Sequence, residues 1–423
     1  MANTSAEVSR TASIGALSAP SPLPLPTEAD ASGRDLGDDE LALLAEVIRS
    51  GVLNCTKGTQ VNQFEREFAE LYDVAHARAV ASGTAAVHTA IAAIDPDPGD
   101  EIITTSVTDM GAIAPILYQR AVPVFADVDP ISLNITPRAV AERITSRTKA
   151  IIVTHLFGNP ADIHQIARIA ADHGIPVIED CAQAYLARAG GCRVGTIGQI
   201  GAFSLQQGKH MTTGEGGVVI TDAAALARRI RLFSDKAWGY GDPDPDHYFL
   251  ALNYRMSELH GAVARAQLNK LDWVVARRQQ TAEQLTRLLT GTPGLTLPQP
   301  LPGATHVYWK YPLTVDPEQI EGGADALGQA LQKRGIHSAP RYIKKPAFEC
   351  RLFTERKTFG SSGCPLTCSH DRGPIHYDAS EYPGTIEGLR RVVVLPWNEF
   401  YTDAHVDFIA SSVQDAVDSL TRP

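Results

Sequence analysis

The stretch GAFSLQQGKHMTTGEGGVVITD, residues 201–222, decides the expected fold. It reads as a strand that ends at Ser204, a turn that carries Lys209, and the glycine-rich segment TTGEGG leading into a second strand. Most lysines in a turn beside a sheet are ordinary surface residues. Glycines, however, permit positive φ and close approach of the backbone, which a lysine joined covalently to a bulky cofactor needs. The stretch therefore predicts a sheet edge with a reactive lysine.

Strand-like runs alternate with helix-length segments on the N-terminal side of this stretch. The runs are EIITT (101–105), VPVFADV (122–128), KAIIVTHL (149–156) and PVIED (176–180). Apolar strands separated by amphipathic helices predict an α/β fold with a mostly parallel sheet covered by helices on both faces. Such sheets bind ligands at the carboxyl ends of their strands, so functional residues are expected just after these runs.

The chain is expected to have three parts. They are a flexible tail rich in Pro, Ser and Ala over residues 1–34, a large domain over 35–272, and a small C-terminal domain over 273–423. The tail cannot bury enough apolar surface to offset ordering. The large domain begins with helical patterns from Asp38 and Phe64, and a long helix with apolar positions from Leu268 to Leu288 links the two domains.

Composition excludes several classes of protein. The 423 residues are 44% apolar and 20% charged, which is ordinary for a globular chain. A net charge of −10 disfavours binding to nucleic acid or to an anionic membrane. No run of about 18 apolar residues occurs, and the first residues lack a basic start followed by an apolar core, so neither a membrane span nor a signal peptide is expected. Six scattered cysteines do not suggest a secreted disulfide framework, so a cytoplasmic protein is expected.

The run PVIED ends in Asp180, which begins the second chemical motif. A carboxylate beside an aromatic nitrogen base keeps that nitrogen protonated, because opposite charges at close range favour the ionised pair. Pyridoxal 5'-phosphate needs such a partner to act as an electron sink. A simple helix cap at Asp180 is the alternative explanation.

The third motif is ASGTAAVHTAI, residues 81–91, a glycine-containing turn that opens a helix. Backbone N–H groups at a helix N-terminus favour a phosphate, and the hydroxyls of Ser82 and Thr84 can add hydrogen bonds. Many helices start with Ser or Thr as plain caps, so the motif is weak by itself. Together the three motifs provide a phosphate site, a partner for a pyridine nitrogen and a lysine nucleophile.

Four motifs also carry a resemblance to a known family. They are SGTAA (82–86), VIEDCAQA (177–184), FSLQQGK followed by TTGEGG (203–217), and NYRMSEL (253–259). In this order they resemble the signature set of the DegT/DnrJ/EryC1/StrS aminotransferases, and the match runs from about Asp38 to the C-terminus. The resemblance implies the type I fold of pyridoxal-phosphate-dependent transferases, with a mostly parallel mixed sheet in the large domain and a smaller α+β C-terminal domain.

The resemblance also implies a role for each matching residue. Lys209 matches the lysine that binds the cofactor covalently and moves the proton, and Asp180 matches the partner of the pyridine nitrogen. Gln183 matches the side chain beside the ring hydroxyl. The phosphate site corresponds to Gly83, Thr84, Ala85 and Ser204. Asn253 matches an asparagine that reaches the cofactor phosphate of the neighbouring subunit, which implies a homodimer with shared active sites.

One position departs from the family pattern. Much of the family has an aromatic residue that stacks on the cofactor ring where this sequence has Asp109, and an acid cannot stack. Three explanations stay open: Met110 or another apolar side chain covers the ring, the alignment shifts by one residue, or the range of substrates differs.

The implied activity is amino transfer from glutamine or glutamate to the ketone of a sugar or cyclitol, free or nucleotide-linked, in specialised-metabolite (antibiotic) or glycan biosynthesis. The string FSLQQGK resembles members that act on cyclitols or free keto sugars, often with glutamine as donor. Candidate substrate contacts are Thr59, His155 and Arg255, each of which is equally well explained as a structural residue.

Three rival interpretations find less support in the sequence. A zinc site would use the cluster Cys350, Cys364, Cys368, His370 and His376, but these residues lack paired CxxC spacing, so no metal is expected. A dehydratase or epimerase of the same family is disfavoured because the known dehydratase branch has histidine where Lys209 stands. A regulator that binds the cofactor without turnover is disfavoured by the complete set of motifs.

Overall fold

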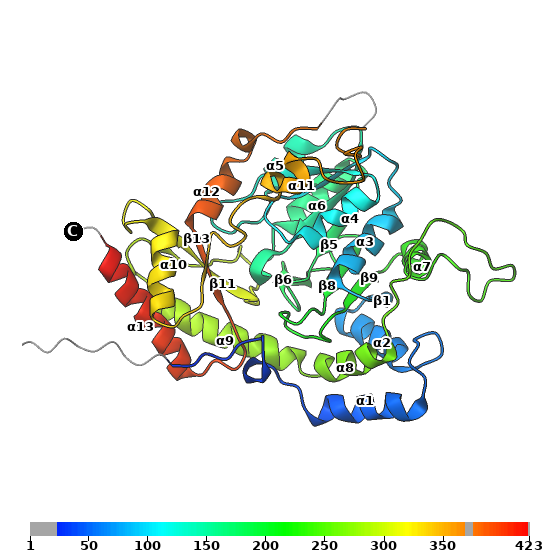
Figure 1. Cartoon of the computed structure of the whole chain (residues 1–423), viewed down its shortest axis with the longest axis horizontal. Coiled ribbons are helices and arrows are strands. Elements are labelled where there is room, and N and C mark those ends of the chain that lie inside the picture. The colour runs from blue at the N-terminus through cyan, green and yellow to red at the C-terminus, as the bar shows by residue number, and fades with distance from the viewer. Residues whose placement is uncertain (1–22, 369–374, 422–423) are drawn as a thin grey trace, which may run out of the picture.

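The computed structural model of the chain describes residues 23–368 and 375–421 (Figure 1). A large lobe is built on a seven-stranded sheet, and a smaller lobe is built on a four-stranded sheet. The long helix α9 (Leu271–Leu289) runs between the two lobes (Figure 1). None of the helices in the described ranges is both long and apolar enough to cross a membrane.

The large sheet is mixed but mostly parallel. Across the sheet its strands are β1 (His76–Val80), β9 (Gly217–Thr221), β8 (Ile200–Ser204), β5 (Val177–Asp180), β4 (Thr148–Thr154), β2 (Glu101–Thr105) and β3 (Val122–Ala126). Strand β9 pairs antiparallel with both of its neighbours, and the pairs from β8 to β3 are parallel. The α/β fold expected from the alternating runs is therefore confirmed.

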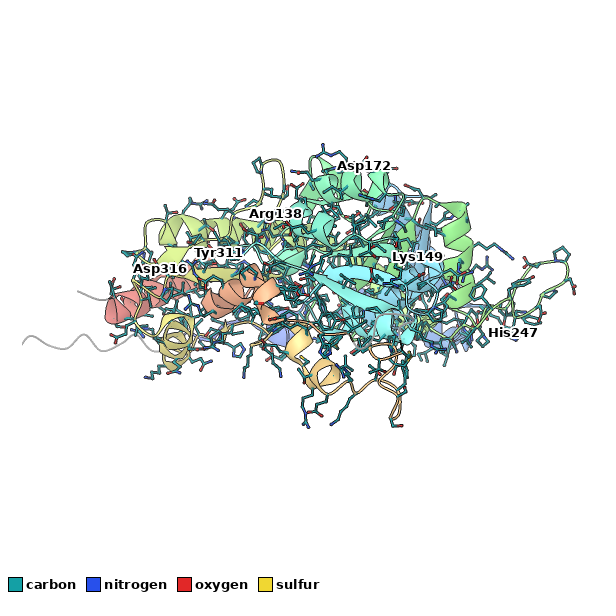
Figure 2. The ribbon with its side chains drawn as sticks, turned by 90° about the horizontal axis from the view of Figure 1, so that it is seen from above. Arg138, Lys149, Asp172, His247, Tyr311 and Asp316 are labelled. Carbon is teal, nitrogen blue, oxygen red and sulfur yellow. A yellow bond between two sulfur atoms is a disulfide. The ribbon has the colours of Figure 1, made fainter. Side chains whose placement is uncertain are left out.

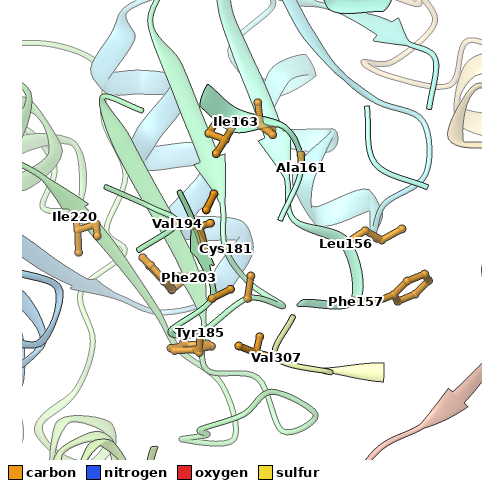
Figure 3. Close-up of a cluster of buried hydrophobic side chains, with 14 of the residues drawn as sticks. Leu156, Phe157, Ala161, Ile163, Cys181, Tyr185, Val194, Phe203, Ile220 and Val307 are labelled. Atoms are coloured by element: carbon orange, nitrogen blue, oxygen red, sulfur yellow. The ribbon is translucent and has the colours of Figure 1, made fainter. Parts of the chain in front are cut away.

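Helices cover both faces of this sheet. The core on one face contains apolar side chains from α2 (Gln60–Tyr72), α6 (Ile163–Asp172) and α8 (Glu258–Leu268), and the core on the other face contains those of α3 (Gly83–Ile94) and α7 (Ala224–Phe233). In β5, Val177 belongs to the first core and Ile178 to the second, which is why the run is apolar without alternation. Figure 3 shows part of the first core, with Phe203 close to Tyr185.

The remaining elements of the large lobe are short or lie at its edge. They are α1 (Asp38–Ser50), α4 (Ala114–Tyr118), α5 (Pro137–Arg143), the two-residue strands β6 (Arg188–Ala189) and β7 (Cys192–Arg193), and the 3₁₀ turns η2 (Met110–Ala112) and η3 (Leu156–Gly158).

The small lobe packs helices on an antiparallel sheet. Its strands, in spatial order, are β10 (Leu295–Thr296), β11 (Lys310–Val315), β13 (Val392–Pro396) and β12 (Ala339–Pro340). Its helices are α10 (Gly323–Lys333), α11 (Arg351–Thr354), α12 (Pro383–Arg391) and α13 (Asp403–Leu420), with 3₁₀ turns η4 (Ala347–Glu349) and η5 (Ala379–Glu381). Helix α9 contributes Leu271 and Val275 to the core of the large lobe, and Leu285 and Leu289 to the core of the small one.

Most expected elements lie within a few residues of their predicted positions, with two differences. The expected long helix is two helices, because the chain turns at Asn269 and Lys270 between α8 and α9. Strand β1 has the sequence HARAV, which is too polar to predict a buried strand, and only its last two residues are fully buried.

The expectation of a flexible tail over residues 1–34 fails for the part that the structure describes. Residues 1–22 lie outside the described ranges, but residues 23–34 include the turn η1 (Ala31–Gly33) and pack on the body of the protein. Arg34 is only 6% exposed and donates hydrogen bonds to backbone carbonyls near residue 208. The composition of the segment could not predict its docking, because the contacts are made by the charged side chains of Arg34 and Glu28 with partners far away in the sequence.

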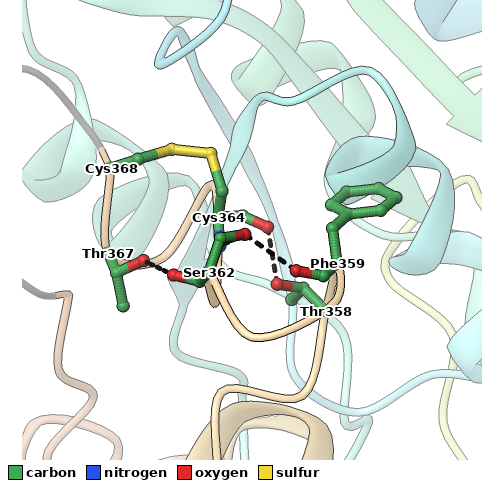
Figure 4. The surroundings of a disulfide bond; sticks show 6 residues. All are labelled: Thr358, Phe359, Ser362, Cys364, Thr367 and Cys368. Carbon is green, nitrogen blue, oxygen red and sulfur yellow. Dashed lines mark hydrogen bonds between the residues drawn. A yellow bond between two sulfur atoms is a disulfide. The ribbon is translucent and has the colours of Figure 1, made fainter.

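Two of the cysteines considered as candidate zinc ligands are bonded to each other instead. Cys364 and Cys368 form a disulfide, shown in Figure 4. Cys350 is free, and Arg356 lies 3.0 Å from the ring nitrogen Nε2 of His376, while His370 falls outside the described residues. The composition did not predict a disulfide at this position.

Candidate active site

A cavity of about 460 Å³ lies at the carboxyl edge of the large sheet. Its walls come from the segments after β1 (Ser82, Gly83, Thr84, Val87), after β2 (Thr108, Asp109, Gly111, Ala112), around the ends of β5 and β8 (Asp180, Ala182, Gln183, Ala202, Phe203, Ser204, Gln206, Lys209), before β9 (Glu215), and from the small lobe and its connections (Trp309, Tyr342). This size suits a small organic ligand. This edge of the sheet is the one where the sequence places the candidate site residues.

The N-terminus of α3 meets the end of β8 at one end of the cavity. Ser82 caps the helix, its hydroxyl accepting the N–H of Ala85 at 3.0 Å. Gly83 has no room for a side chain, because an added Cβ would lie 2.6 Å from Cβ of Ser204. The first backbone N–H groups of a helix have no acceptor within the helix. Those of Gly83 and Thr84 therefore offer a site for an anion beside the Ser204 hydroxyl.

Asp180 lies at the end of β5 and is 4% exposed. One of its oxygens accepts the N–H of Ala182 at 3.1 Å, and the other accepts the hydroxyl of Thr154 at 3.5 Å. Burial raises the pKa of Asp180, although the Ala182 N–H and the positive charge of Lys209 oppose this effect. A buried carboxylate of this kind is most stable with a partner that brings positive charge.

Gln183 and Tyr342 form another part of the wall. The amide oxygen of Gln183 accepts the N–H of Phe157 at 2.7 Å, which fixes the orientation of the amide. Tyr342 packs edge-on against the ring of Phe157, 4.8 Å between centres, and burial raises the pKa of its hydroxyl. The amide nitrogen of Gln183 and the Tyr342 hydroxyl are thus neutral hydrogen-bonding groups at this wall.

Lys209 is placed by the turn between β8 and β9. Its amine lies 4.2 Å from the centre of the Trp309 ring. Burial lowers the pKa of Lys209 to about 8, against the opposing negative charges of Asp180 and Asp109. With this pKa about a tenth of the amine is uncharged at pH 7, in the form that a nucleophile or a general base must have.

Asp109 stands in the wall of the cavity, so the position where the family usually has an aromatic residue does face the site. One carboxylate oxygen accepts the N–H of Gly111 at 2.7 Å. Met110 packs with the cluster around Phe125 and Phe348 and does not line the cavity. Met110 is therefore not placed to cover a bound ring, and the aromatic residues in the cavity wall are Phe203, Trp309 and Tyr342.

The cavity brings together six of the eight residues expected to bind the cofactor. They are Gly83, Thr84, Asp180, Gln183, Ser204 and Lys209. Ala85 lies one residue further along α3 and is buried against the sheet. Asn253 is exposed and lies away from this cavity, where its backbone forms a bridge with Asp235. Its position does not contradict a contact with a neighbouring subunit.

The three candidate substrate contacts lie outside the cavity. Thr59 is an exposed residue before α2, and Arg255 forms an ion pair with Asp235. His155 is fully buried. Its Nδ1 accepts the N–H of Ala161 at 3.1 Å, and its Nε2 lies 3.0 Å from a carboxylate oxygen of Glu179. Both ring nitrogens of His155 thus have protein partners.

Two functional candidates were missed from the sequence. Trp309 directly precedes β11, and Tyr342 lies two residues after β12, in a segment without strand or helix signals. Both reach the cavity from the C-terminal half of the chain. No local pattern marks them, because their place depends on how the two lobes pack.

The residues fit pyridoxal phosphate by the chemistry of their donors and acceptors. The narrow space between Gly83 and Ser204 suits a phosphate, since only a residue without Cβ leaves it open. The buried carboxylate of Asp180 suits a protonated ring nitrogen, and the Lys209 amine suits an aldehyde.

Comparisons with known proteins give the family of the chain. The sequence matches the model of the DegT/DnrJ/EryC1/StrS aminotransferase family over residues 34–371. It is 37% identical over 325 residues to L-glutamine:2-deoxy-scyllo-inosose aminotransferase of Streptomyces kanamyceticus, a match covering 72% of this chain and 75% of that protein. It is 31% identical over 396 residues to the spore coat polysaccharide biosynthesis protein SpsC of Bacillus subtilis (strain 168), covering 90% and 95%.

A solved structure shows the same fold. 3-Amino-5-hydroxybenzoic acid synthase superposes with a TM-score of 0.82 at 28% sequence identity, covering 94% of this chain and 100% of that chain.

Proposed function

The chain belongs to the DegT/DnrJ/EryC1/StrS aminotransferase family, and from this premise we propose that it moves the amino group of glutamine to the ketone of a cyclitol or free keto sugar, with pyridoxal phosphate as cofactor. Aminotransferase activity is that of the family and of the relatives. The choice of donor and acceptor is supported by the 37% identical relative, whose name specifies glutamine and 2-deoxy-scyllo-inosose.

One observation carries the proposal. Lys209, Asp180 and the Gly83–Ser204 pair, which lie far apart in the sequence, line a single cavity. A structural helix cap at Asp180 or a surface role for Lys209 would not require the three to meet. Their convergence supports a site for a phosphorylated pyridine aldehyde.

The cofactor would be held at both ends. The N–H groups of Gly83 and Thr84 and the hydroxyl of Ser204 would bind its phosphate, and Asp180 would pair with its ring nitrogen. When bound, pyridoxal phosphate supplies a ring that accepts the negative charge left when the amino donor loses its α-proton.

Lys209 carries the proton in this proposal. With a pKa of about 8, its Nζ atom is able to lose a proton near neutral pH and then to accept one from the α-carbon of the donor. In the second half of the reaction Nζ returns a proton to the acceptor carbon. The closeness of its pKa to the working pH makes both directions feasible.

Asp180 and Gln183 orient the ring rather than move protons. The Ala182 N–H and the Thr154 hydroxyl fix the two oxygens of Asp180, so that the carboxylate does not turn away from the ring. Gln183, fixed by the Phe157 N–H, would present its amide nitrogen to the ring hydroxyl.

The dehydratase alternative receives no support from the site. His210, the neighbour of Lys209, is buried, and its Nε2 lies 3.0 Å from the carbonyl oxygen of Val307. It does not line the cavity, so it is not placed to replace the lysine.

We further propose a homodimer in which each copy completes the other's site. The segment between α7 and α8 extends away from the large lobe and carries His247, whose Nδ1 lies 2.7 Å from the carbonyl oxygen of Lys236 (Figure 2). On this segment Leu250 is 95% exposed and Leu252 is 44% exposed. Two large apolar side chains this exposed favour a protein surface as partner. A second copy would bring Asn253, which follows them, toward the cofactor phosphate.

A separate cavity supports the same interface. It measures about 590 Å³, lies beneath Trp238 and Tyr240 of this segment, and contains none of the predicted catalytic residues. We assign it to the contact between subunits rather than to catalysis. A cytoplasmic location and a role in antibiotic or glycan biosynthesis complete the proposal, and the name of the relative SpsC supports the glycan role because it specifies spore coat polysaccharide biosynthesis.

The test is a visible absorption spectrum of the purified protein supplied with pyridoxal phosphate. We expect a yellow band that fades when glutamine is added and returns when 2-deoxy-scyllo-inosose follows. Lys209→Ala should lose the band and all turnover, whereas Lys333→Ala, at an exposed lysine of α10, should retain both. If the band fades with glutamate but not with glutamine, glutamate takes the place of glutamine as the proposed donor. A Lys209→Ala protein with full activity would overturn the role assigned to Lys209.

A further inference from the structure

The peptide turn that carries Lys209 is held from outside by two side chains. Arg34 donates hydrogen bonds to the carbonyl oxygen of Lys209, at 2.8 Å, and to that of Gln207. The indole N–H of Trp309 donates to the carbonyl oxygen of Gly208 at 2.6 Å. All three consecutive carbonyls of the turn, residues 207–209, therefore accept N–H groups from other segments.

Arg34 is itself firmly placed. Its side chain is 2% exposed, and its guanidinium lies 4.0 Å from a carboxylate oxygen of Glu399, which also forms an ion pair with Arg278 at 2.7 Å. The carbonyl of the preceding Gly33 accepts the side-chain N–H of Asn398 at 3.1 Å. A buried guanidinium with this many partners does not move freely.

Glu28 adds a second contact from the same segment. Its carboxylate forms an ion pair with Lys310, and its backbone carbonyl accepts the side-chain amide of Gln207 at 2.8 Å. The amine of Lys310 lies 5.1 Å from the centre of the Trp309 ring, whose face also contacts Lys209. The carboxylate of Glu28 thus neutralises the positive charge of Lys310, which acts on the Lys209 amine from the small-lobe side.

We propose that residues 27–34, the N-terminal strap, are part of the catalytic apparatus, with Arg34 as a positioning residue that fixes the 207–209 turn and Glu28 as a residue that balances the charge of Lys310 beside the Lys209 amine. The inference rests on the proposed role of Lys209. It assigns a function to a segment whose composition suggested only a flexible tail.

The choice of arginine at position 34 follows from its geometry. A guanidinium presents several N–H donors in one plane, so a single side chain reaches two carbonyls and a carboxylate at once. Lysine has one rotating donor group and would reach at most part of this set. Loss of Arg34 leaves the carbonyls of Gln207 and Lys209, which are partly buried, without this donor and frees the turn to rotate.

Charges from several elements face Lys209. Asp180 at the end of β5 and Asp109 after β2 raise its pKa, and Lys310 of β11 lowers it. Removal of the Glu28 charge leaves Lys310 uncompensated, which disfavours a second positive charge at Lys209. The amine should then lose its proton at a lower pH.

The experiment measures how fast the apo protein binds pyridoxal phosphate, followed by absorbance across a pH series. The rate at which the wild-type apo protein binds the cofactor should rise as the pH increases through about 8, because Lys209 loses its proton over this range. We expect Arg34→Ala to load about tenfold more slowly at every pH, with partial recovery when methylguanidine is added. The loading rate of Arg34→Lys should lie between those of wild type and Arg34→Ala. Glu28→Gln should shift the midpoint of the curve of loading rate against pH to lower pH, with a nearly normal maximal rate.

Matched controls come from an exposed ion pair on α5. Arg138, labelled in Figure 2, is 87% exposed in its side chain and pairs with Glu142, so Arg138→Ala and Glu142→Gln repeat the same chemical changes away from the site. Both controls should load like wild type.

The outcomes separate the strap from the proposed function. If wild type fails to load, the function itself is wrong. If wild type loads and Arg34→Ala loads at the same rate, or is slowed but not recovered by methylguanidine or lysine, Arg34 has no positioning role. An unchanged midpoint in Glu28→Gln would overturn the charge-balancing role of Glu28.

Discussion

The amine of Lys209 lies 4.2 Å from the centre of the Trp309 ring, and the same ring's N–H holds the carbonyl of Gly208. One side chain from the small lobe thus contacts the reactive group and the backbone that carries it. The ring face attracts a positive charge, and burial opposes one, so Lys209 is held near the balance between its two protonation states.

Asp109 should control this balance. A negative charge nearby favours the protonated amine, so Asp109→Asn should lower the pKa of Lys209 below about 8 and move the midpoint of cofactor loading to lower pH. The measurement is loading rate against pH. Asp172→Asn, at an exposed residue of α6, is the control and should leave the midpoint unchanged. A shift to higher pH would contradict the assigned sign.

Gly83→Ala should weaken cofactor binding. The added methyl would lie 2.6 Å from Cβ of Ser204, so the first turn of α3 must move away from β8 and spoil the phosphate site. We expect the dissociation constant for pyridoxal phosphate to rise about tenfold or more, since displaced charge-assisted hydrogen bonds cost about 1.5–3 kcal/mol. Gly37→Ala adds the same methyl in open space and should bind normally.

His306 should make the protein sensitive to acid. It is buried and stacks on Tyr308 at 3.9 Å, and burial lowers its pKa from 6.5 to about 3. Below pH 6.5 the unfolded chain gains a proton that the folded chain does not, so stability falls as the pH falls. The expected loss is about 2 kcal/mol between pH 6.5 and pH 5.

Urea unfolding of His306→Asn at these two pH values measures this contribution. The variant should lose about 2 kcal/mol less than wild type over the interval, whatever its stability at neutral pH. His173→Asn, at an exposed histidine, should lose as much as wild type. Equal losses in wild type and His306→Asn would contradict the prediction.

Leu250→Glu should weaken the proposed dimer. The side chain is 95% exposed in the single chain, so a charge there costs little to an isolated subunit but much to a buried interface. Sedimentation of both proteins at several concentrations reports the change. Leu301→Glu alters another exposed leucine, 46% exposed, and should leave the association as in wild type. A wild-type protein that is monomeric throughout would refute the interface.

The sequence allowed the large sheet to be predicted because its strands are apolar on both faces. EIITT coincides with β2, and PVIED contains β5. Strand β1 escaped prediction because His76 and Arg78 belong to an edge strand and are only partly covered. The break between α8 and α9 carries neither glycine nor proline, so nothing local predicted it.

The candidate site residues were predictable for a related reason. Asp180 lies at the end of a strand, Gly83 at the start of a helix and Lys209 in the turn that follows β8, so the residues around each of them carry a local pattern. Trp309, Tyr342 and Arg34 act on the same site from other parts of the chain, where only the packing of the two lobes brings them close. Sequence motifs therefore indicated the residues proposed to react but not the residues proposed to position them.

The N-terminal strap also bears on how the protein folds. Gly33 bonds to Asn398, 365 residues later, and Arg34 to Lys209, 175 residues later. During synthesis these first residues emerge long before their partners, so the strap is among the last segments able to dock. Contacts of such long sequence separation form slowly. A newly made chain would therefore complete its sheets first and gain a correctly set lysine only once the C-terminal lobe had closed over its own beginning.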